Sequence, residues 1–173
     1  SIEADLVAVA PDDSDLVAIA NSSPPQVYLT GNGGLSWSNL GTPQESGGAP
    51  AAAIYDIAIS AASDGVHYIA VPGKEAGDIA NVWYDDIGAA VPVWKETKDL
   101  PGFSSASEVK AVAFSPNFAL DETMVAISAK NGTSVNLQML SLNSERWNNS
   151  AGFSSFPVTI ISSSGITELT SAS

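Results

Sequence analysis

Short apolar runs alternate with turn-forming residues along most of the chain. Three times, two such runs flank a cluster of polar or small residues; the pairs cover residues 6–10 and 16–20, 54–60 and 67–71, and 109–114 and 123–128. Runs of this length, bounded by Pro, Asp, Asn or Gly, are typical of β-strands joined by tight turns. The pattern therefore predicts three strand-turn-strand units.

A third apolar run and a tryptophan follow each pair. The third runs cover residues 27–29, 82–84 and 137–140, and the tryptophans are Trp37, Trp94 and Trp147, spaced 57 and 53 residues apart. Repeats of about 55 residues with four short strands each are typical of β-propeller blades. We predict an all-β chain that forms a β-propeller segment of about three four-stranded antiparallel blades. The blades are expected at residues 1–50, 51–103 and 104–156, with residues 157–173 starting a further blade or forming a tail.

The segment from Thr30 to Trp37 contains the strongest turn signal in the chain. Its Asn-Gly-Gly sequence lies between two strand-like runs, a pattern that predicts a β-hairpin. Glycine adopts left-handed dihedral angles at little cost, and Asn32 can bond its own backbone two residues on. We expect Trp37 to fold back over this hairpin and to be buried.

This segment resembles the Asp-box, or BNR repeat. Thr30, Asn32, Gly34, Ser36 and Trp37 fill the fixed positions of that motif. In the family the box is a structural hairpin within propeller blades of sialidases, sortilin-like receptors and many secreted or surface proteins. Residues 113–121 also resemble a Ser-Pro-Asn-Phe-Ala stretch of bacterial and archaeal cell-surface proteins with such propellers. The second and third repeats keep the tryptophan but have lost the box.

Three blades do not close a ring, because propellers usually have four to eight. The resemblance therefore implies one of three arrangements: a fragment of a larger propeller, several chains that complete one, or an open stack of blades. The expected partners are other segments of the same protein or other copies of it. We favour a fragment of a larger, assembled surface protein.

The charge balance and the absence of cysteine exclude several classes of partner and site. The 173 residues include 6 Lys and Arg against 19 Asp and Glu, which gives a net charge of −13. Such a chain repels phosphate backbones and anionic membranes, so nucleic acid is not an expected partner. No apolar run approaches the roughly 18 residues of a membrane span. Without cysteine there are neither disulfides nor thiolate metal sites.

An extracellular or cell-surface location is expected, chiefly from the surface-protein resemblance. Asn-x-Ser/Thr sequons at Asn21, Asn131 and Asn148 permit glycosylation there. The most consistent function is that of a non-catalytic structural or interaction module in an S-layer-like assembly.

Catalytic residues are not indicated by the sequence. A sialidase needs three arginines around its substrate, but Arg146 is the only arginine in the chain. His67 is the only histidine, and no Gly-x-Ser-x-Gly motif accompanies it. No pair of carboxylates is singled out by its spacing. We predict that the chain is not an enzyme and needs no cofactor.

Acidic residues gather in corresponding turns of the three repeats. These are Asp12, Asp13 and Asp15, then Asp64, then Asp121 and Glu122. If the blades superpose, these turns lie on one rim. Oxygen-rich turns can bind Ca²⁺, so Asp12, Asp13 and Asp15 form a possible calcium site. A solvated acidic rim is the simpler interpretation.

Two alternative functions remain open. The first is a glycan- or peptide-binding propeller that uses Trp83, Tyr84 and Tyr55 as stacking platforms. The second is a fragment of a glycosidase whose catalytic residues lie outside this chain.

Overall fold

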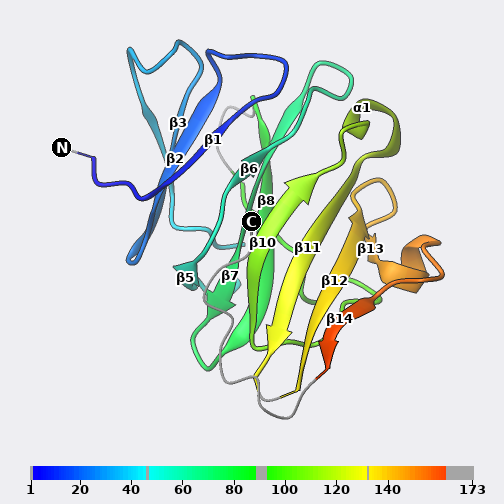
Figure 1. The fold of residues 1–173 in the computed structure, drawn as a ribbon. Helices are drawn as coiled ribbons and strands as arrows, with labels where there is room; N and C mark the ends of the chain where they lie inside the picture. The colour runs from blue at the N-terminus through cyan, green and yellow to red at the C-terminus, as the bar shows by residue number, and fades with distance from the viewer. Residues whose placement is uncertain (1, 46, 89–92, 132, 163–173) are drawn as a thin grey trace.

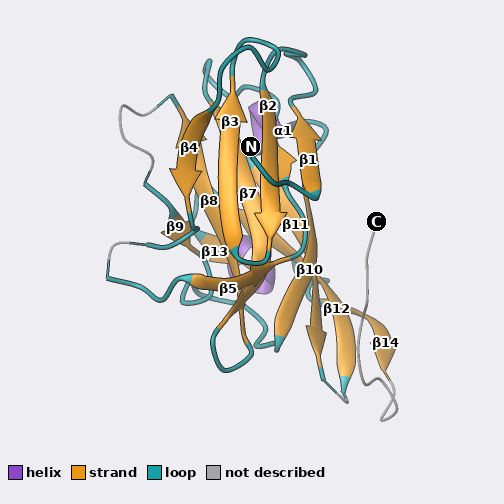
Figure 2. Ribbon diagram, turned by 90° about the vertical axis from the view of Figure 1, so that its left-hand side faces the viewer, coloured by secondary structure: helices purple, strands orange, loops and turns teal. Residues whose placement is uncertain are grey.

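Three antiparallel β-sheets follow one another along the chain and pack side by side (Figure 1). This computed structural model describes residues 2–45, 47–88, 93–131 and 133–162. The first sheet contains β1 (Leu6–Val9), β2 (Val17–Ser22), β3 (Pro25–Thr30) and β4 (Ser38–Gly41), in that order. Figure 2 shows these four strands side by side, facing the viewer.

The middle sheet contains the next five strands. They are β5 (Ala51–Ile54), β6 (Ala58–Ile59), β7 (His67–Glu75), β8 (Ile79–Ile87) and β9 (Lys95–Glu96). Both β5 and β6 pair with β7, so they are two pieces of one interrupted strand. The sequence predicts one continuous run from 54 to 60. Asp56 breaks it, because its Oδ2 accepts a hydrogen bond from the backbone N–H of Val112 in the third sheet, 3.0 Å away.

The third sheet contains the remaining strands. They are β10 (Glu108–Phe114), β11 (Thr123–Lys130), β12 (Ser134–Ser141), β13 (Arg146–Trp147) and β14 (Val158–Ser162). A short helix, α1 (Phe118–Asp121), lies between β10 and β11, and a 3₁₀ helix, η1 (Asn148–Ala151), follows β13. The sequence pattern predicts only a turn before β11. The ring of Phe118 draws the chain inward, since it is fully buried against Tyr68 and Phe114.

The all-β class and the three antiparallel sheets are thus confirmed, and segment 103–107 links the middle and third sheets. The expected four strands are found only in the first sheet: the other two have five, because β5 and β6 divide one strand of the middle sheet and β14 joins the third. Of the expected tail, residues 157–162 contribute β14, which pairs with β12 in the third sheet. Residues 163–173 lie outside the described residues.

Neighbouring sheets share two apolar cores, one on each face of the middle sheet. Ile69, Val71 and Trp83 point toward the first sheet, where they meet Ala18 and Val27. The alternate residues of the same strands point the other way. Ala70, Val82 and Tyr84 pack on the third sheet, against Met124, Ala126 and Leu140. Because successive side chains of a strand point to opposite faces, both faces of the middle sheet are buried.

The turns that precede the second strand of each sheet lie at one end of the stack. In Figure 1 the β1–β2 turn, the β6–β7 turn and α1 are grouped at the top. Asp12 in the first turn accepts a hydrogen bond at Oδ2 from the backbone N–H of Ala62 in the second, at 3.0 Å. Ser63 in the second turn donates to Oε1 of Glu122 beside the third, at 2.9 Å. The acidic turns of the three repeats therefore share one rim.

Candidate functional site

The hairpin from Thr30 to Trp37 joins β3 to β4 and is held by its own side chains. The Thr30 hydroxyl donates to Oδ1 of Asn32 at 2.8 Å and accepts a hydrogen bond from the backbone N–H of Gly34 at 3.0 Å. Asn32 then reaches Ser36 twice: its amide nitrogen donates to the Ser36 hydroxyl, and its Oδ1 accepts the Ser36 backbone N–H. The hairpin prediction is confirmed, and four of the five motif residues have a definite structural task.

Gly34 and Trp37 complete this hairpin. Gly34 has φ of +88°, in the left-handed region that favours glycine, and it lies against the Trp37 ring. Trp37 is only half-buried, however, and not buried as expected. It belongs to an end sheet, which has a neighbouring sheet on one face only.

The other two tryptophans join neighbouring sheets. Trp94 is 4 % exposed, and its indole nitrogen donates to the carbonyl of Leu40 in β4, at 3.0 Å. Trp147 is fully buried, and its indole nitrogen donates to the carbonyl of Thr97, just after β9, also at 3.0 Å. In both cases a tryptophan of one sheet donates to a carbonyl in, or just after, the last strand of the sheet before it. Strand β8 ends at Ile87, and residues 89–92 before Trp94 lie outside the described residues.

The possible calcium ligands have separate roles in the structure. Asp12 contacts Nε2 of His67 at 2.9 Å, while Oδ1 of Asp13 accepts the backbone N–H of Asp15. The hydrogen bond from Ala62 lowers the pKa of the Asp12 carboxyl, and His67 lowers it further, whereas the slight burial of Asp12 opposes them. Among the described residues, no group of three or more acidic or histidine side chains is arranged to hold a metal ion.

The three sequons differ sharply in exposure. Asn131 is exposed and Asn21 is half-buried. Asn148 is only 1 % exposed, and its side chain makes three hydrogen bonds: it donates to Gly102 and to Gln138, and it accepts the backbone N–H of Met139. The folded chain cannot accept a glycan at Asn148, because the amide is fully used inside the third sheet. Nothing in the spacing of residues signals this role.

The proposed stacking platforms are not free surfaces. Trp83 is 0 % exposed and Tyr84 is 4 % exposed, so both rings belong to the core between sheets. The ring of Tyr55 is covered by the ammonium of Lys110, which lies 3.6 Å from the ring centroid and 3.0 Å from a carboxylate oxygen of Glu108. The simpler interpretation of these aromatic residues, packing between sheets, is correct for Trp83 and Tyr84.

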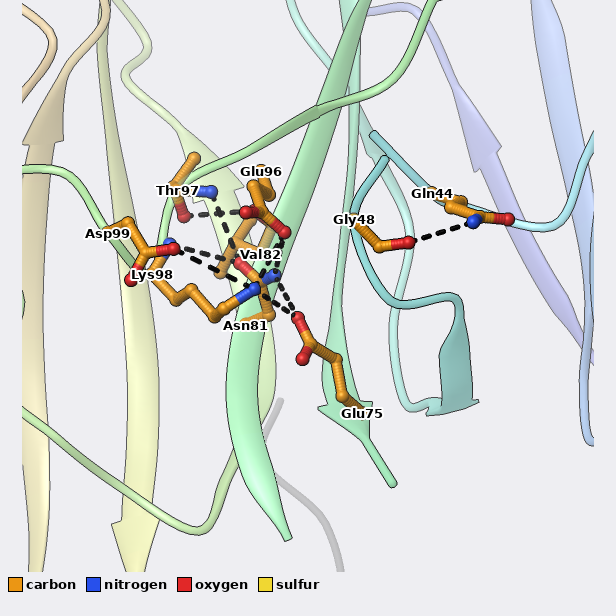
Figure 3. Close-up of polar contacts among 9 residues, drawn as sticks. All are labelled: Gln44, Gly48, Glu75, Asn81, Val82, Glu96, Thr97, Lys98 and Asp99. Carbon is orange, nitrogen blue, oxygen red and sulfur yellow. Dashed lines mark hydrogen bonds and ion pairs between the residues drawn. The ribbon is translucent and has the colours of Figure 1, made fainter. Parts of the chain in front are cut away.

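A polar cluster at the outer edge of the middle sheet is the densest group of charges in the structure (Figure 3). The Lys98 ammonium lies 2.7 Å from Oε1 of Glu75 and 2.7 Å from Oε2 of Glu96. Asn81 donates to Glu75 at 2.9 Å, and its own oxygen accepts the backbone N–H groups of Thr97 and Lys98. Gln44 and Gly48 bond each other in a separate contact nearby.

This cluster fixes strands and offers little for catalysis. Burial alone would lower the pKa of Lys98, but its hydrogen bonds to Glu75 and Glu96, together with their charges, raise that pKa above its ordinary value. A pair of carboxylates acts in general acid and base catalysis when one is protonated and both can reach the substrate. Here one ammonium group binds both carboxylates, and the Glu75 side chain is 4 % exposed.

Two further acidic residues, the buried Asp85 of β8 and the half-buried Asp56 between β5 and β6, have raised pKa values. Burial, reinforced by the charge of Asp86, raises the pKa of Asp85 to about 6, although backbone N–H groups of Val93 and Asp86 oppose this rise. Burial also raises the pKa of Asp56, against the two backbone hydrogen bonds that its carboxylate accepts. Raised pKa values occur at active sites, but Asp56 serves here to join two sheets.

A groove follows the innermost strands β1, β6 and β10 and has a volume of about 500 Å³. Its walls are mostly apolar and include Val7, Val9, Ile59 and Val112. Asp12, at the end of the groove, is the one acidic residue that lines it within the described part of the chain. The lining thus holds one carboxylate and no second acidic residue to pair with it, within the described part of the chain.

Compared with known proteins, the chain matches no family model, no curated protein and no solved structure. None of the helices in the described ranges is long and apolar enough to cross a membrane.

Proposed function

We propose that the chain is a non-catalytic structural and interaction module, a three-blade segment of a BNR-type β-propeller, in an extracellular or cell-surface assembly. One observation carries the proposal: successive sheets are joined by an equivalent tryptophan contact, made by Trp94 and then by Trp147. A repeated contact between successive sheets is what an assembly of blades requires. The resemblance of residues 30–37 to the Asp-box supports the same interpretation.

The use of the polar side chains also favours a structural role. Asp12, Asp56 and Glu122 each bind a group of the neighbouring sheet. Glu75 and Glu96 are held by Lys98 within their own sheet. The first three carboxylates therefore join neighbouring sheets, and the last two join strands within one sheet. The surface location is supported by the resemblance of residues 113–121 and by the exposed sequon at Asn131.

The non-catalytic role is tested with a panel of fluorogenic glycosides. We expect no hydrolysis above the buffer rate by the wild-type chain. Glu75→Gln and Glu96→Gln serve as matched variants, because they remove the only close pair of carboxylates held by one cation in the described residues. Hydrolysis by the wild type that is lost in either variant, with the circular dichroism spectrum preserved, would overturn the proposal.

A further inference from the structure

The two contacts between sheets follow one spacing rule. The acceptor of Trp94 is the carbonyl of Leu40, three residues after Trp37, and the acceptor of Trp147 is the carbonyl of Thr97, three residues after Trp94. The middle and third sheets each use their own tryptophan as a donor to the sheet before them. The first and middle sheets each offer, as the acceptor, a carbonyl three residues after their own tryptophan. The middle sheet uses both.

The outer face of the first sheet carries an unused donor half of this contact. Trp37 is half-buried, and its indole N–H donates to no residue within the described ranges. Across the sheet from Trp37, on β1 and β2, the same face is apolar. Val7 and Val9 are 67 % and 51 % exposed, and they pair with Ile19 and Val17 across β1 and β2. A solvated sheet face normally carries polar residues, so these four side chains indicate a face that is covered in the assembled protein.

The outer face of the third sheet carries the acceptor half. The rule places the acceptor at the carbonyl of Ser150, three residues after Trp147. This face is also apolar, with Val125 and Ile127 on β11 opposite Met139 and Leu137 on β12. Two hollows of about 190 and 560 Å³ lie along it.

We propose that the outer face of the third sheet packs on the outer face of the first sheet of a second copy of this chain. This contact would continue the interfaces already formed between the three sheets, with the Trp37 indole donating to the Ser150 carbonyl of the other copy. The inference rests on the proposed function, because it treats each sheet as a blade. Rings of four to eight blades are usual, and six is the only multiple of three in that range. Two copies would therefore close the ring.

The occupant is a second copy because each chain carries both complementary faces. The pairing joins unlike faces, so an exposed first face of one copy always meets an exposed third face of the other. The charge of −13 on each chain opposes the association. Salt screens this repulsion and strengthens apolar contacts. We therefore expect the dimer to be favoured as sodium sulfate concentration rises.

Analytical ultracentrifugation of the chain tests the proposal. We expect a species of twice the 17.7 kDa of one chain. Val17→Asp on the first face and Ile127→Asp on the third should each yield monomers. An equimolar mixture of the two variants should form a one-to-one dimer, because each retains the face that the other has lost. Ile79→Asp, at a 46 % exposed position of the middle sheet, is the control and should remain dimeric.

Trp37→Phe gives a second, milder measurement. It keeps an aromatic ring but removes the N–H donor, so we expect the dimer to dissociate about 3–10-fold more readily. Circular dichroism verifies that every variant is folded. A wild-type chain that is monomeric at all concentrations would overturn the inference. The inference would also be overturned if only one of the two face substitutions abolished the dimer. That result would mean that the same face of both copies forms the contact. A monomer without glycosidase activity would leave the proposed function standing.

Discussion

The middle sheet and the two end sheets share one succession of strands but differ in how many of their faces are covered. Ile69 and Ala70 are adjacent in the middle sheet, point to opposite faces and are both 0 % exposed. In the first sheet Ala18 is 0 % exposed, whereas Ile19 beside it is only half-buried. Ile19, which faces outward, is larger and more apolar than the buried Ala18. The comparison shows that the strand sequence provides for burial on both faces, while the neighbouring sheet decides whether burial occurs.

Replacing a tryptophan should give the largest difference in stability between a site buried between two sheets and a site on the outer face of an end sheet. Trp147→Ala empties a buried site between the middle and third sheets and should lower the free energy of unfolding by about 3–5 kcal/mol. Trp37→Ala, on the outer face of an end sheet, should lower it by only about 1–2 kcal/mol, since less area is removed from water. Urea denaturation followed by circular dichroism measures both. Equal losses would show that the end-sheet tryptophan is as fully buried as Trp147.

Replacing a buried carboxyl of the middle sheet, Asp85, should give the next largest change in the free energy of unfolding. The folded pKa of Asp85 is raised to about 6, above an unfolded value near 4. Between these values the folded state binds more protons, so the contribution of Asp85 to stability falls as pH rises through this window. Asp85→Asn should therefore raise the free energy of unfolding by about 1–2 kcal/mol at pH 7, a value reduced for residual solvation.

The gain from Asp85→Asn should shrink as pH falls toward 4 and disappear below about pH 3, where the wild-type carboxyl is protonated in both states. Asp15→Asn, at an exposed position in the turn between β1 and β2, is the matched control for the loss of one surface carboxylate. Thermal unfolding at a series of pH values distinguishes the two variants. A gain that is the same at both pH values would mean that the ionised form of Asp85 is not penalised.

Breaking the rim contact between the first and middle sheets should change the free energy of unfolding less than the tryptophan and Asp85 substitutions do. Asp12 is joined to Ala62 and His67, but its side chain is 44 % exposed. Its pKa is lowered, so its contribution is present above the unfolded value near 4 and is lost as pH falls through the folded pKa. Asp12→Asn should destabilise the chain by less than about 1 kcal/mol at neutral pH. Asp13→Asn, whose carboxylate bonds only its own turn, is the control. A larger loss from the control would contradict the assignment.

Strand positions could be predicted from the sequence because their signal is local. The runs near β1, β2, β10 and β11 are apolar and end at Pro, Asp or Asn, so both the strands and their turns are encoded within a few residues. The same holds for the hairpin at residues 30–37, where each bond spans at most four positions.

Interactions between distant segments could not be predicted in this way. Asp56 interrupts a predicted strand because of a backbone group 56 positions away in the chain. Asn148 resembles a glycosylation site locally, yet it bonds Gly102, 46 positions earlier. The burial of Trp83 and Tyr84 likewise depends on which sheets lie on either side. A single sequence contains no signal for such pairings, so core residues and surface residues of these types look alike.

The hairpin between β3 and β4 has a consequence for the order of folding. Its hydrogen bonds connect Thr30, Asn32, Gly34 and Ser36, all within seven consecutive residues. Contacts of such short sequence separation close with little loss of chain entropy and form early. This loop can therefore set the register of β3 against β4 before any second sheet is available. The first sheet carries its own nucleus, whereas the contacts made by Trp94 and Trp147 must wait until two sheets have formed.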